Sequence, residues 1–124
     1  MASVLCYNLP AEKRIKLQLI CTRLKMHVRH VLQDQYMLPI GALCGMLEPG
    51  ASPAPATETF DDEMLVFCGF DSRLLDRFLA EMRAARMQPV LLKAVLTPSN
   101  MHWSSVRLCR ELLSERETLQ RRKM

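Results

Sequence analysis

Hydrophobic residues along this chain form two kinds of segment, short continuous runs and longer stretches with helical spacing. The most apolar run is Met64–Phe70, and a second run occupies Val90–Leu96. Between them, Leu74, Phe78 and Met82 recur every four residues, which indicates an amphipathic helix. We therefore predict a strand, a helix and a strand over residues 64–70, 71–86 and 90–96. A strand that is apolar throughout is typical of one covered on both faces.

The first half of the chain shows the same order of segments with weaker patterns. A short apolar run at Val4–Tyr7 predicts a strand, and residues 27–32 predict a second strand of mixed polarity that suits a sheet edge. Between them we predict a helix over residues 10–25. The apolar positions assigned to its buried stripe are Ile15, Leu17, Leu19, Ile20, Cys21, Leu24 and Met26.

Two further segments complete the predicted elements. Residues 36–45 are apolar, but Pro39, Gly41 and Gly45 interrupt them, so we predict a short helix or turn packed on the sheet. A last helix is predicted from near Ser104 to Arg121.

The two halves resemble each other in pattern at an offset of about 61 residues, because residues 4–9 match residues 65–70 and each run precedes a helix. This pattern predicts an α/β fold. We expect a small three-layer open sheet of about four mainly parallel strands, built from two βαβα-like halves in the order 2-1-3-4. The most apolar strand, residues 64–70, then lies inside the sheet.

Composition and charge divide a single predicted domain into three parts. Residues 1–46 and 64–124 form the two halves, and both carry more bases than acids within a net charge of +4. Residues 47–63 contain five acids and no base, together with Pro, Gly, Ala, Ser and Thr, which predicts a flexible acidic linker. A basic surface attracts nucleic acid or acidic partners, although bases on solvated helix faces are the ordinary alternative.

The cellular setting is predicted from cysteines and hydropathy. The five cysteines are widely spaced and lie among apolar neighbours, so we expect buried free thiols in a reducing compartment. No apolar run is long enough to cross a membrane, and the N-terminus lacks a signal-peptide pattern. We expect a cytoplasmic protein without a membrane partner.

The segment Leu92–Asn100, followed by Trp103, and the run Met64–Phe70 resemble motifs of the bacterial domain of unknown function 3783 family. The resemblance is strongest over residues 64–113. It implies a bacterial, cytoplasmic protein, and it supplies no activity and no catalytic residue.

Polar residues that follow the predicted strands are the best candidates for ligand binding. In an open α/β sheet, ligands bind at the carboxyl ends of the strands, near a switch in strand order. Turn and cap chemistry is the alternative role for the same residues. The candidates are Asn8, Asp71, Thr97, Ser99, Asn100, His102 and Trp103.

Other potentially reactive residues are weaker candidates. Lys93 is either a buried base or a charge that protects an edge strand from pairing, and the predicted order favours the edge. His27 and His30 point to opposite faces of a strand, so we expect no metal site. No Gly-x-Ser-x-Gly or phosphate-binding glycine motif occurs, and we expect no catalytic residue and no cofactor.

Three functions follow as hypotheses. The first is a non-enzymatic interaction or regulatory module that binds a protein partner or a second copy of itself. The second is a small-molecule-binding or enzymatic domain that uses the rim at Asn8, Asp71 and residues 97–103. The third is nucleic-acid binding through basic helices.

Overall fold

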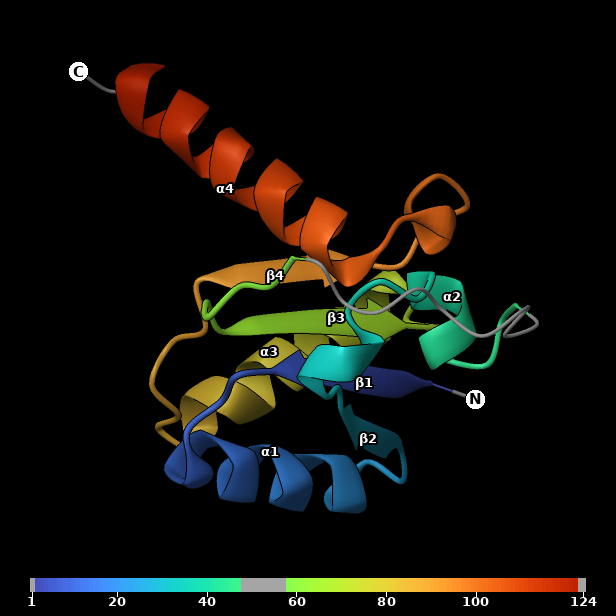
Figure 1. The fold of residues 1–124 in the computed structure, drawn as a ribbon. Helices are drawn as coiled ribbons and strands as arrows, with labels where there is room; N and C mark the ends of the chain where they lie inside the picture. The colour runs from blue at the N-terminus through green and yellow to red at the C-terminus, as the bar shows by residue number, and fades with distance from the viewer. Residues whose placement is uncertain (1, 48–57, 123–124) are drawn as a thin grey trace.

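The computed structural model describes residues 2–47 and 58–122, which contain a four-stranded sheet in the order β2-β1-β3-β4 (Figure 1). The predicted α/β class and the strand order are therefore confirmed. The strands are β1 (Ser3–Tyr7), β2 (His27–His30), β3 (Met64–Cys68) and β4 (Leu92–Val95).

Strand direction differs from a fully parallel arrangement at one place. β1 pairs with β2 in parallel, and β3 pairs with β4 in parallel. The central pair is antiparallel, because Ser3 lies opposite Cys68 and Tyr7 lies opposite Met64. The sheet is thus parallel within each half and antiparallel where the halves meet.

Helices cover both faces of the sheet and produce three layers (Figure 1). The helices are α1 (Ala11–Arg23), α2 (Ile40–Leu43), α3 (Ser72–Ala84) and α4 (Ser105–Arg122). Because side chains alternate along a strand, Val4 and Phe67 enter the core beneath α1 and α3, whereas Leu5 and Val66 enter the core beneath α2 and α4. The core therefore consists of two apolar clusters separated by the sheet.

Backbone features of the first half recur 61 residues later in the second half. α1 and α3 each contain 13 residues and begin 61 positions apart. After α1, the amide of Met26 donates to the carbonyl of Cys21, and after α3 the amide of Met87 donates to the carbonyl of Met82. The residues just before these donors, Lys25 and Arg86, have φ values of 58° and 55°. Both helices therefore end in the same left-handed turn.

Part of the predicted linker packs against the core. The ring of Phe60 stacks on Tyr36 with centroids 4.5 Å apart, Glu58 pairs with Arg110, and Glu63 pairs with Lys13. One aromatic contact and two ion pairs therefore join residues 58–63 of the predicted linker to the core. Residues 48–57 of that prediction lie outside the described residues.

α4 packs on the sheet mainly through its first half, where Leu112 also contacts the core. Its buried residues, Ser105, Val106, Leu108 and Cys109, all lie in its first two turns. The rest of the helix extends away from the sheet (Figure 1). None of the helices in residues 2–47 and 58–122 is long and apolar enough to cross a membrane.

Candidate functional site

The predicted ligand rim is divided by the antiparallel central pair. Asn8 follows β1, whereas Asp71 and Thr97 follow β3 and β4. Since β1 runs opposite to β3, Asn8 lies at one edge of the sheet and Asp71 and Thr97 lie at the other. The expectation that these residues share one rim is therefore wrong. It assumed that the strands of both halves point in the same direction.

Asn8 has a structural role at its own edge. Its φ is 58°, and its side-chain amide donates to the carbonyls of Phe60 and Asp62 at 3.0 and 3.1 Å. Its carbonyl oxygen accepts a 2.9 Å hydrogen bond from the hydroxyl of Tyr36. These bonds attach residues 58–63 to the end of β1 and occupy the polar groups that a ligand would need.

The Thr97–Asn100 turn forms its own hydrogen bonds. The Asn100 side chain is 9% exposed, accepts from the Thr97 amide at 2.8 Å and donates to the Val95 carbonyl at 3.0 Å. The Thr97 hydroxyl accepts from the Asn100 amide at 3.1 Å. Ser99 is exposed and makes no side-chain cap. This arrangement closes the turn and satisfies its polar groups internally.

The other predicted residues are separated by the sheet. Asp71 caps α3 by accepting a 2.8 Å hydrogen bond from the Leu74 amide, as turn and cap chemistry predicts. Trp103 packs with the cluster beneath α2 and α4, and the Arg107 guanidinium lies 4.3 Å from its ring centroid. His102 is exposed. Because α3 and α4 cover opposite faces, Asp71 and Trp103 do not form one site.

A cleft of about 420 Å³ lies at the edge where Asn8 is found. Its walls come from α1, the chain before β3, the start of β4 and α4. They include Lys13, Asp62, Glu63, Leu91, Leu113 and Arg116. Sequence reasoning missed this cleft because its residues come from four distant segments and form no motif.

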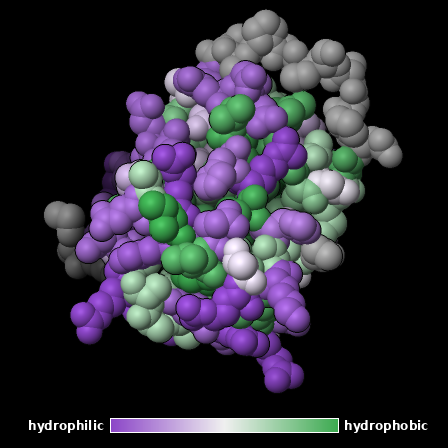
Figure 2. All heavy atoms as spheres, turned by 90° about the horizontal axis from the view of Figure 1, so that it is seen from below, coloured by the Kyte–Doolittle hydropathy of each residue, from purple (hydrophilic) through white to green (hydrophobic). Residues whose placement is uncertain are grey.

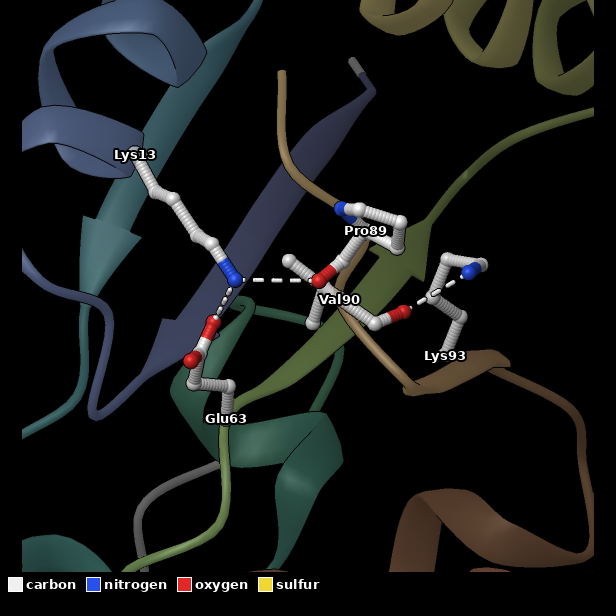
Figure 3. Close-up of polar contacts among 5 residues, drawn as sticks. All are labelled: Lys13, Glu63, Pro89, Val90 and Lys93. Carbon is white, nitrogen blue, oxygen red and sulfur yellow. Dashed lines mark hydrogen bonds and ion pairs between the residues drawn. The ribbon is translucent and has the colours of Figure 1, made fainter.

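The polar centre of the cleft is the ammonium group of Lys13. Its Nζ donates to Oε1 of Glu63 at 2.5 Å and to the carbonyl of Pro89 at 2.9 Å (Figure 3). The side chains of Lys13 and Glu63 are 14% and 33% exposed. Through these two bonds Lys13 joins α1 to the segments that precede β3 and β4. We assign it a structural role, since both partners are already engaged.

Lys93 lies on β4, at the edge of the sheet, as the predicted order requires. Its Nζ donates to the Val90 carbonyl at 2.7 Å (Figure 3). Burial and the nearby charge of Arg116 lower the pKa of Lys93. Its position fits an edge-protecting charge better than a buried base.

Cys6 and His30 form a contact that the sequence patterns did not indicate. The Cys6 sulfur lies 2.8 Å from Nδ1 of His30, on neighbouring strands. Burial, followed by the neighbouring thiol of Cys21, raises the pKa of Cys6 to about 12. A protonated, buried thiol is a poor nucleophile, so this pair resembles a catalytic dyad in distance only.

The remaining thiols are mostly buried, and Cys44 is partly exposed. All five cysteines are free, and burial raises the pKa of Cys21 to about 12 and that of Cys109 to about 11. In residues 2–47 and 58–122 no group of three or more His, Cys, Asp or Glu side chains is placed to hold a metal ion.

The outer face of α1 carries two exposed apolar side chains. Ile15 and Leu19 are one helical turn apart and are 62% and 61% exposed. Both were predicted to be buried, which is wrong, because Leu17, Ile20 and Cys21 form the buried stripe instead. We call Ile15 and Leu19 the α1 ridge. Figure 2, which views the molecule from the side of α1, shows hydrophobic groups surrounded by hydrophilic ones.

The fold described above defines an α/β domain of two βαβα halves. Residues 63–119, which contain β3, α3, β4 and most of α4, match a family model described as a domain of unknown function (DUF3783). This match confirms the resemblance of the second half of the chain to this family that the sequence motifs indicated. Searches of curated proteins and of solved structures gave no match.

Proposed function

We propose that this protein is a small, non-enzymatic interaction module of the bacterial cytoplasm, and that it binds a protein partner through the α1 ridge. The observation that carries the proposal is the exposure of Ile15 and Leu19, which are 62% and 61% exposed. Fully burying one such side chain stabilises a complex by about 1.5–3 kcal/mol, so two adjacent ones are suited to anchor a partner.

The chemistry of the other candidate residues supports a binding role over an enzymatic one. Asn8, Asp71 and Asn100 use their side chains in hydrogen bonds within the fold. The buried thiols have raised pKa values and are weak nucleophiles. Free cysteines and the family match are both consistent with a reducing, cytoplasmic setting.

The same proposal includes an internal repeat. The recurrence of helix lengths, hydrogen bonds and left-handed residues at an offset of 61 supports an origin of both halves from one βαβα unit. The ridge would then be a later specialisation of the first unit, because the equivalents of Ile15 and Leu19 are Asp76 and Ala80.

A photo-crosslinking experiment tests the proposed function. The full chain carries p-benzoylphenylalanine in place of Leu19, and the protein is irradiated in the cells that naturally produce it. We expect one discrete protein adduct, identified by mass spectrometry, which disappears when Ile15→Ser is added.

The matched control places the same crosslinker at Ala80, the equivalent position on α3. We expect no such adduct from Ala80, because α3 exposes no large apolar side chain. The same adducts from both positions, or none from Leu19, would refute a role for the ridge in binding.

A further inference from the structure

We infer that the partner of the α1 ridge is an acidic amphipathic helix of another protein. The inference rests on the proposed function and specifies the chemistry of the partner. Three features of the described residues support it: the spacing of the ridge, the charge around it and the polarity of the matching face of α3.

The spacing of the ridge fits a helical partner. Ile15 and Leu19 are separated by one turn of α1, and both project from its solvent side. A partner helix that lies along α1 would place apolar residues at three- and four-residue intervals against them. Such a partner can bind without a groove on this protein, because Ile15 and Leu19 can pack between the side chains of the partner helix.

The charge of the surrounding face selects an acidic partner. Residues 10–25 and 71–86, which contain α1 and α3 with their flanking turns, carry nine Lys or Arg and four Asp or Glu. Two ion pairs neutralise part of this charge, because Glu81 pairs with Arg23 at 2.8 Å and Glu63 pairs with Lys13, which leaves seven of the nine bases and three of the four acids outside the ion pairs of the described residues. Acidic residues that flank the apolar stripe of the partner would meet this positive field and speed association.

The same observations argue against two other occupants. A second copy of this chain would bring one basic face against another, which like-charge repulsion opposes. Nucleic acid would use stacking platforms, but Phe78, the aromatic residue of α1 and α3, is buried in the core. Two aliphatic side chains on a face rich in basic residues fit a protein helix better than they fit the nucleobases or sugars of a nucleic acid.

Fluorescence anisotropy with synthetic peptides tests the inference. The probe is a labelled helical peptide of Glu, Ala and Leu with its leucines in one stripe, and it is titrated with the full-length protein. The comparison peptide has the same composition with the leucines distributed around the helix. We expect the striped peptide to bind about tenfold more tightly, since only it can bury both ridge residues.

Variants assign the binding to the ridge. Ile15→Ser and Leu19→Ser should each weaken binding of the striped peptide by about tenfold. Ala80→Ser, at the equivalent of Leu19, should leave its affinity unchanged. Circular dichroism checks that each variant is folded. We expect every variant to fold, because both ridge side chains are exposed.

Three outcomes would overturn the inference. They are equal binding of both peptides, no binding of either, and tighter binding of a labelled single-stranded oligonucleotide that the ridge variants do not weaken. A crosslinked partner at Leu19 combined with any of these results would preserve the proposed function and reject only the acidic helix. The absence of both a crosslink and peptide binding would reject the two proposals together.

Discussion

α1 and α3 occupy equivalent places in the two halves of the molecule, but they distribute their apolar residues differently. Both helices span 13 residues, and both pack on the same face of the sheet. In α3 the buried positions are apolar and no large apolar side chain is exposed. In α1 an apolar Ile15 stands where α3 has Asp76, and a largely buried Lys13 stands where α3 has the partly buried Leu74.

This difference separates requirements of the fold from features that need another explanation. Features present in both helices, such as Leu17 and its equivalent Phe78, are needed to cover the sheet. Features present only in α1 are not needed by the helix as such. The presence of Lys13 where α3 has Leu74 is explained by a contact within the molecule, because Glu63 pairs with the ammonium group of Lys13. The ridge has no such internal explanation.

The largest expected effect concerns the residues that the two helices share. Leu17 and Phe78 are both fully buried in the core beneath α1 and α3. We predict that Leu17→Ala lowers the free energy of unfolding by about 2–5 kcal/mol and Phe78→Ala by about 3–5 kcal/mol, because each leaves a cavity. Urea unfolding followed by circular dichroism measures both losses.

The same experiment tests whether the halves are one folding unit. The five residue pairs of β1 and β3 join them, so we expect a single transition in each variant. Trp103 lies on the opposite face of the sheet from both mutations, and its fluorescence should change at the same urea concentration. A second transition in which Trp103 remains folded after Leu17→Ala would show that the halves are independent.

A smaller effect is expected at the position where α1 departs from α3. Replacing Lys13 by Met, Lys13→Met, leaves the partly buried Glu63 without its cation, and we predict a loss of about 1–3 kcal/mol in unfolding free energy. Adding Glu63→Gln should recover part of this loss, because the uncompensated charge is removed.

The control for this pair is Lys16→Met on the same helix. Lys16 is partly exposed and its ammonium group donates one 3.2 Å hydrogen bond to the Arg86 carbonyl, so we expect a change within about 0.5 kcal/mol. If Lys13→Met is equally neutral, the ion pair does not stabilise the junction between the halves.

The sequence was sufficient to predict which segments form strands and in what order they lie. Continuous apolar runs such as Met64–Phe70 are explained only by burial on both faces, and the mixed polarity of residues 27–32 requires an edge. Strand direction was not predictable from the same pattern. More than 30 residues separate β2 from β3, and a connection of that length permits β3 to run either way.

The candidate site was likewise predictable from the sequence only in part. Local chemistry, such as the Asp71 cap, was predictable because donor and acceptor are three residues apart. The Lys13–Glu63 cleft was not, because its partners are 50 residues apart and Glu63 belongs to a segment predicted to be a linker. The ridge was misassigned because α1 has apolar residues on more than one side, so periodicity could not identify its buried face.

The smallest expected effect concerns the two left-handed helix ends. Lys25 and Arg86 have positive φ values, which cost a residue with a Cβ atom more than they cost glycine. We predict that Lys25→Gly and Arg86→Gly each raise the free energy of unfolding by about 0.5–1 kcal/mol. Urea unfolding measures the single variants, and the double variant should show the sum of both gains, since the two sites share no side-chain bond.

Gly69 provides the opposite test, because its φ of 74° already uses the freedom of glycine. Gly69→Ala should lower the free energy of unfolding by about 1 kcal/mol. A loss of stability in Lys25→Gly but not in Arg86→Gly would mean that the Lys25 side chain contributes more than its backbone strain costs. The ends of α1 and α3 would then be equivalent in geometry but not in energy, and the first half would differ from the second at one more place than the ridge and Lys13.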